Sequence, residues 1–168
     1  MTDDELVISR STPGARFDAP ASAAASPTTA AAAPAELSAD AEAFVAQVIA
    51  DAEQPVVLFA LEWCEFCWSL RKLFAACGIA YRSVDLDSTE YQAGDRGGRI
   101  RTVLAARTGS RTIPQLFVGG DWIGGTTETM AAFKDGRLQR LLRAHDVAFD
   151  EQADVDPDAL LPAWLHPR

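Results

Sequence analysis

The chain has 168 residues, 48% of them hydrophobic, with 15 Lys plus Arg against 24 Asp plus Glu and a net charge of -9. This composition is sufficient for a packed core and excludes disorder throughout. No apolar run reaches the about 18 residues of a membrane span, and the acidic N-terminus lacks a signal-peptide pattern, so we expect a soluble, cytoplasmic protein. Three cysteines are too few for a disulfide-stapled scaffold, which favours a redox or metal site.

The first 37 residues are predicted to form a disordered tail. Residues 19–35 consist of Ala, Pro, Ser and Thr alone. Such a composition offers too little apolar surface to offset the entropy of ordering the chain. The pattern favours a spacer over the alternative of a partner-docking segment.

A folded domain is predicted over residues 38–145. Ser38 is a candidate N-cap for a first helix, whose apolar residues share one face. These residues are Phe44, Val45, Val48 and Ile49. Residues 56–61 form an unbroken apolar run, typical of a strand buried on both faces. A second amphipathic helix follows and ends at Gly78.

The second half of the domain continues the alternation. Residues 81–86 are predicted to be a strand, and a helix is predicted to end at Thr108-Gly109. This order favours parallel pairing of the first two strands. Residues 115–118 and 121–123 flank Gly119-Gly120, which predicts a hairpin, and one last helical region is expected through about Ala144. The predicted order is α-β-α-β-α-β-β-α.

Charge and apolar residues are unevenly distributed. Residues 55–145 carry 12 Lys plus Arg and 9 Asp plus Glu, so the acidic excess lies in the flanks. Five arginines gather in the middle of the chain, at positions 96, 99, 101, 107 and 111. They lack interleaved aromatic residues, which favours a solvated helix face or a small-anion site over nucleic-acid binding. In the extension 146–168, acidic and then apolar, Trp164 either packs back on the domain or marks a partner site, and we favour packing. We expect His166 to be a surface residue.

The motif Cys64-Glu65-Phe66-Cys67 follows the predicted buried strand and opens a helix. The free N–H groups and the positive end of the helix dipole favour a thiolate on Cys64, the predicted nucleophile. Cys67, one turn further on, is the predicted resolving thiol, which attacks a mixed disulfide on Cys64. Cys77 lies about 15 Å further along the helix, beyond the about 7 Å that a disulfide allows, so we expect a small buried side chain there.

A zinc site is the structural alternative for the paired cysteines. The other candidate ligands are Cys77, His145 and His166. None of them has the short paired spacing of zinc fingers or ribbons, so the sequence favours redox chemistry without a metal.

Three stretches, Trp63–Cys67, Thr108–Phe117 and Ile123–Glu128, resemble the signature stretches of glutaredoxins, in the same order. The resemblance covers roughly residues 40–145. It implies an α/β protein with the thioredoxin fold, a four-stranded mixed sheet flanked by helices. It also implies a glutathione-dependent thiol-disulfide oxidoreductase that reduces protein disulfides or glutathione mixed disulfides through the Cys64 thiolate. Together with the composition, this favours a monomer without nucleic-acid or membrane partners.

The resemblance also assigns a glutathione site. Pro114 would be cis and would place the backbone of Ile113 beside Cys64, where it pairs with the cysteinyl main chain of glutathione. The N–H groups of Thr126 and Thr127, with the Thr127 hydroxyl, would meet the γ-glutamyl carboxylate. The full set of assigned residues is Phe66, Arg101, Thr112, Ile113, Pro114, Gly125, Thr126, Thr127 and Glu128.

Several residues depart from the family pattern. Leu61 stands where glutaredoxins usually carry a lysine, and Glu62 and Glu65 beside Cys64 would oppose thiolate formation. Arg101 is expected to supply the missing carboxylate clamp. The threonine pair after the glycines replaces a pair with a carboxylate, for which Glu128 would compensate.

Two alternative functions follow from the same motif. Glu65-Phe66 replaces the Pro-Tyr of common dithiol members, and without that proline some members dimerise around a [2Fe-2S] cluster. Cys64 from each chain and two glutathione thiolates would then be its ligands. Trp63 is reminiscent of thioredoxins, so the second alternative is a disulfide reductase that does not use glutathione. Cys67 argues against the monothiol branch of the family.

Overall fold

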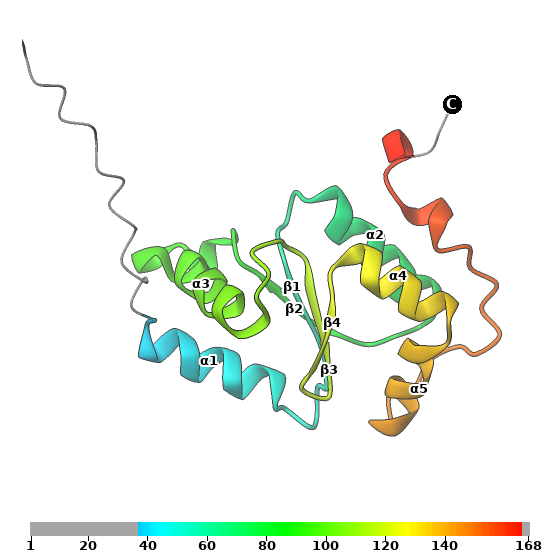
Figure 1. Ribbon diagram of the computed structural model, residues 1–168, viewed down its shortest axis with the longest axis horizontal. Coiled ribbons are helices and arrows are strands. Elements are labelled where there is room, and N and C mark those ends of the chain that lie inside the picture. Colours follow the sequence, from blue (N-terminus) through cyan, green and yellow to red (C-terminus); the bar gives the residue numbers. More distant parts are fainter. Residues whose placement is uncertain (1–36, 166–168) are drawn as a thin grey trace, which may run out of the picture. The chain divides into compact units, whose positions relative to one another are not determined.

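A four-stranded mixed sheet in the order β2-β1-β3-β4 forms the centre of the fold (Figure 1). The computed structural model describes residues 37–165, so the predicted tail, apart from its last residue, and His166 lie outside the described residues. The strands are β1 (Val56–Ala60), β2 (Arg82–Asp85), β3 (Gln115–Val118) and β4 (Asp121–Gly124). β1 pairs with β2 in parallel and with β3 in antiparallel orientation, and β3 and β4 form the predicted hairpin.

β1 is buried along its whole length because both faces of the sheet are covered. Its side chains alternate between two apolar cores: Leu58 and Ala60 belong to one, and Val57 and Phe59 to the other. The predicted buried strand is confirmed. The two cores thus hold the carboxyl end of β1 in place. The cysteine motif follows directly after this end of the strand.

Helices cover both faces of the sheet (Figure 1). One face carries α1 (Ala39–Ile49) and α3 (Arg96–Thr108). The opposite face carries α2 (Glu65–Ala76), α4 (Thr126–Lys134) and α5 (Arg137–Ala144). Short 3-10 turns complete the described elements: η1 (Thr89–Tyr91), η2 (Ala93–Asp95), η3 (Asp158–Leu160) and η4 (Ala163–Leu165). This is the expected four-stranded mixed sheet flanked by helices, and over residues 37–165 no helix is both long and apolar enough to span a bilayer.

One detail of the predicted helices is wrong. The last helical region is two helices, since Gly136 adopts a φ of 77° between α4 and α5. A left-handed residue cannot continue an α-helix, and glycine adopts this conformation without steric cost. Ser38 is the N-cap residue of α1, as predicted, although its hydroxyl donates to the Asp40 carboxylate and accepts no hydrogen bond from a helix N–H group.

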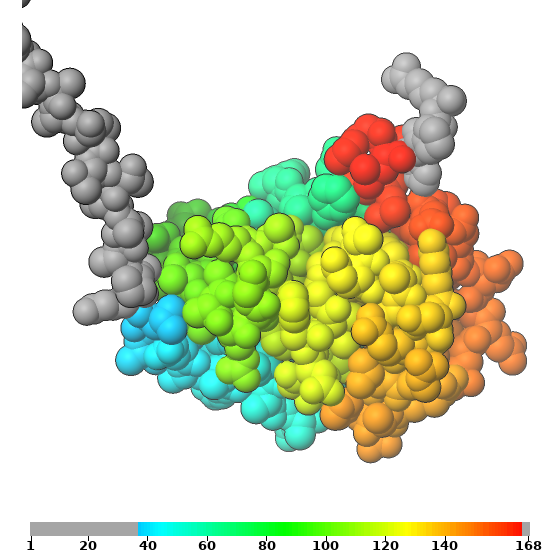
Figure 2. Space-filling model, viewed as in Figure 1, coloured from blue at the N-terminus to red at the C-terminus, as the bar shows by residue number. Residues whose placement is uncertain are grey.

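The C-terminal segment, residues 146–165, returns along the α2, α4 and α5 side of the sheet (Figure 1). The N–H of Asp150 donates to the carbonyl of Cys77 at 2.7 Å. Leu160 and Leu161 pack against the core, and Asp158 forms an ion pair with Lys134. In Figure 2 the last described residues rise above the surface on this side of the molecule.

Candidate active site

Cys64 is the N-cap residue of α2, which begins one residue later. The backbone of Cys64 is extended, and its Sγ accepts a hydrogen bond from the N–H of Cys67 at 3.4 Å. The thiol is half-buried, so one side of the sulfur is available to a substrate. The unpaired N–H groups and the dipole of a helix N-terminus stabilise a thiolate at this position. The geometry fits the predicted nucleophile.

Cys67 lies beneath Cys64 and is fully buried. Its Sγ accepts a hydrogen bond from the N–H of Leu61 at 3.5 Å. Burial, followed by the proximity of Cys64, raises the pKa of Cys67 to about 12. Cys67 therefore remains protonated at neutral pH in the reduced protein. Cys77 is also buried, as expected, and all three cysteines are unpaired.

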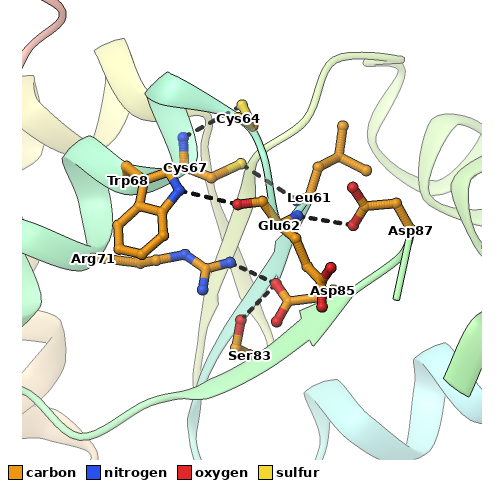
Figure 3. Close-up of polar contacts among 9 residues, drawn as sticks. All are labelled: Leu61, Glu62, Cys64, Cys67, Trp68, Arg71, Ser83, Asp85 and Asp87. Atoms are coloured by element: carbon orange, nitrogen blue, oxygen red, sulfur yellow. Dashed lines mark hydrogen bonds and ion pairs between the residues drawn. The ribbon is translucent and has the colours of Figure 1, made fainter. Parts of the chain in front are cut away.

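The loop between β1 and Cys64 is anchored through the backbone of Glu62 (Figure 3). Its N–H donates to Asp87 at 2.8 Å, and its carbonyl accepts a hydrogen bond from the indole N–H of Trp68 at 3.0 Å. The guanidinium of Arg71 lies 5.4 Å from the centroid of the Trp68 ring and pairs with Asp85. Residues of α2 and of the chain after β2 thus both fix the loop that precedes Cys64.

Sequence reasoning missed the roles of Trp68 and Asp87. A signal for Asp87 was present, because parallel strands end at the same edge of a sheet and β2 ends at Asp85. Trp68 offered none, since a tryptophan on the exposed face of a helix carries no sign of which carbonyl it will bind.

The two residues between the cysteines contact the C-terminal segment. The indole N–H of Trp164 donates to Oε2 of Glu65 at 2.7 Å. The Trp164 ring also meets the ring of Phe66 edge to face, with centroids 5.8 Å apart. Trp164 contacts the domain at the cysteine motif, as expected, but its side chain is 65% exposed and not packed into a core.

The peptide bond between Ile113 and Pro114 is cis, as the resemblance implied. Ile113 is half-buried and packs against both cores. The buried side chain of Gln115 donates to the carbonyl of Thr112 at 3.1 Å and to that of Ser110 at 2.8 Å. Sequence reasoning gave Gln115 no role, yet it fixes the loop that presents Thr112 and Ile113.

The turn before α4 is closed by the Glu128 side chain, whose Oε2 accepts a hydrogen bond from the N–H of Gly125 at 2.9 Å. The predicted substitute for a family carboxylate thus caps its own helix. The Thr126 hydroxyl donates to the carbonyl of Phe66 at 3.0 Å, linking α4 to the cysteine helix. Thr127 is exposed.

The arginine group divides between structural and solvent-facing side chains. Arg96 lies over the ring of Phe44 at 4.7 Å, and Arg99 pairs with Asp40 at 3.7 Å. Arg101 is exposed on α3 and forms no salt bridge within residues 37–165. Within the same range Arg107 and Arg111 are exposed and without a salt bridge as well, so all three guanidinium groups are available to an external anion.

Comparison with known proteins agrees with this geometry. A glutaredoxin family model matches residues 56–123. A glutaredoxin of Ricinus communis is 40% identical over 87 residues, which cover 52% of this chain and 80% of that protein. This chain belongs to the glutaredoxin family.

The family assignment extends to more distant relatives and to structure. Monothiol glutaredoxin-S10 of Oryza sativa subsp. japonica is 33% identical over 96 residues, 57% of this chain and 56% of the relative. The chain thus spans little more than half the length of some relatives that it matches. A buckwheat glutaredoxin-glutathione complex has a TM-score of 0.58 at 31% identity and covers 64% of this chain and 91% of its own. The predicted fold is confirmed, and the chain is an oxidoreductase of the glutaredoxin kind.

Proposed function

We propose that this glutaredoxin reduces glutathione mixed disulfides, and also protein disulfides, with glutathione as the reductant. The observation that carries the proposal is the pairing of a half-exposed Cys64 at a helix N-terminus with a buried, protonated Cys67. The similarity to a glutaredoxin that was solved with glutathione supports the choice of reductant. A dithiol site of this kind works in a reducing compartment, so we place the protein in the cytoplasm.

In the first step the Cys64 thiolate attacks the glutathionyl sulfur of the substrate. The substrate S–S bond breaks, a Cys64–glutathione disulfide forms, and the substrate leaves as a thiolate that takes a proton from water. A second glutathione thiolate then attacks the glutathionyl sulfur on Cys64. Glutathione disulfide forms and the Cys64 thiolate is restored, so glutathione is oxidised and the substrate reduced.

Protein disulfides require Cys67. Attack by Cys64 leaves the substrate joined to the enzyme, and the Cys67 sulfur then displaces it while the Cys67 proton passes to the leaving thiolate. Because the pKa of Cys67 is about 12, its thiolate is scarce at neutral pH. We therefore propose that glutathione, and not Cys67, resolves the mixed disulfide of the first reaction.

Glutathione is proposed to bind between the loop of Thr112 and Ile113, the start of α4 at Thr126 and Thr127, and Arg101. The fixed backbone before Pro114 supports main-chain pairing with the peptide. The N-terminus of α4 suits a carboxylate because its first N–H groups have no partner in the helix. Arg101 supplies the positive charge that Leu61 does not.

A [2Fe-2S] cluster does not fit a single copy of this chain. Such a cluster needs four sulfur ligands, and Cys64 is the one thiol of residues 37–165 that is not buried. A second copy and two external thiols would be required. We therefore leave the cluster outside the proposed function and make it an outcome of the test.

The test is the reduction of a small glutathione mixed disulfide by glutathione and glutathione reductase, with wild type, Cys64→Ser and Cys67→Ser. We expect activity in the wild type, none in Cys64→Ser, and retained activity in Cys67→Ser. An inactive wild type would overturn the proposal. Visible absorbance and dimers after anaerobic purification would then indicate cluster binding, and activity with a flavin-dependent reductase alone would indicate a thioredoxin-like enzyme.

A further inference from the structure

The end of the C-terminal segment lies on the residues between the two active-site cysteines. Trp164 donates to the Glu65 carboxylate at 2.7 Å, and its ring meets Phe66 at 86° with centroids 5.8 Å apart. The family signature stretches end at Glu128, so no glutaredoxin motif accounts for Trp164. Its hydrogen bond to Glu65 joins residues that are 99 positions apart in the chain.

The path that brings Trp164 to this place is fixed at several points. Asp150 is hydrogen-bonded to the end of α2, and Asp158 pairs with Lys134 of α4. Leu160 and Leu161 are partly buried against the core. Trp164 is therefore held at the end of an anchored segment, and its two contacts fasten that end to the cysteine motif.

The fastened end projects from the surface. Trp164 is 65% exposed although its edge is bound, and the last described residues stand above their surroundings in Figure 2. A substrate disulfide must bring one sulfur to about 2 Å from the Cys64 sulfur in the mixed disulfide. A folded substrate then has to place its own surface over Glu65 and Phe66, where Trp164 lies. A small mixed disulfide occupies far less of this surface.

We propose that Trp164 is a specificity-determining residue. By holding the C-terminal segment against the cysteine motif, it forms a steric barrier that hinders folded protein substrates and leaves room for small glutathione mixed disulfides. This inference rests on the proposed function.

The experiment compares kcat/KM for two substrates, the glutathione mixed disulfide of 2-mercaptoethanol and serum albumin glutathionylated at its free thiol. Loss of an edge-to-face aromatic pair should shift the equilibrium between the bound and the released C-terminal segment roughly 2- to 12-fold. We expect Trp164→Ala to raise the albumin-to-small-substrate ratio by about that factor, with the small-substrate value unchanged. Trp164→Phe, which keeps a ring and loses the N–H donor, should raise the ratio less.

Trp122→Ala is the matched control, because Trp122 is another exposed tryptophan, on β4. It should leave the ratio unchanged. An unchanged or lower ratio in Trp164→Ala would overturn the inference while leaving the proposed function intact, whereas a wild type inactive on the small substrate would overturn the proposed function. If Trp164→Ala does not fold, Trp164→Leu removes the ring but keeps apolar volume, and the same ratio decides.

Discussion

Replacing Cys67 by alanine should remove a specific pH dependence of stability. Burial raises the pKa of Cys67 from 9.0 to about 12, whereas in the unfolded chain the thiol is exposed and ionises at its ordinary pKa. Between these two pH values the unfolded chain has lost a proton that the folded chain keeps. Unfolding is therefore favoured as the pH rises, by about 1.4 kcal/mol per pH unit, and the stabilisation is fully present below about pH 9.

The assay is guanidinium unfolding of the reduced protein at about pH 8 and about pH 10. Both chains should carry Cys64→Ser, so that Cys67 is the active-site thiol by which they differ. The chain with Cys67 should lose about 1.4 kcal/mol more over this interval than the chain with Cys67→Ala. Cys77, Tyr81 and Tyr91, whose pKa values are also raised by burial, cancel in the difference. Equal losses in the two chains would refute the idea that burial keeps Cys67 protonated.

Two further substitutions test the surroundings of Cys64. Trp68→Phe keeps an aromatic ring and removes the donor to the Glu62 carbonyl. In a denaturant titration the free energy of unfolding should fall by about 0.5–1.5 kcal/mol. The kcat/KM for the small mixed disulfide should also fall. No change in either quantity would mean that the loop needs no anchor. Arg101→Ala should raise the KM for glutathione about five- to tenfold with kcat unchanged. This is the result expected when about 1 kcal/mol of binding energy is lost equally from the ground state and the transition state. Arg107→Ala, exposed on the same helix, is its control, and an equal rise in both variants would contradict the assignment.

The predictable parts of this molecule are those whose cause is local in sequence. The apolar run of β1 and the glycine stop after α2 follow from burial and backbone conformation, and the structure has both. The break at Gly136 was also readable, because Asp-Gly is a turn signal, but the apolar periodicity on either side masked it. Trp164 on Glu65 was not readable, since the partner of an indole N–H depends on the path of the intervening chain.

The loss of the family lysine has different consequences for the two cysteines. The N–H of Leu61, a backbone donor that every residue except proline supplies, still bonds to the Cys67 sulfur. The change from lysine to leucine therefore leaves the resolving thiol's hydrogen bond intact and removes positive charge on the ligand side alone. Because Glu62 and Glu65 add negative charge there, the proposed glutathione site depends on a cation from outside this loop, for which Arg101 is our candidate. Trp164 binds the carboxylate of Glu65, so the same contact that narrows access to Cys64 also gives this charge a fixed partner.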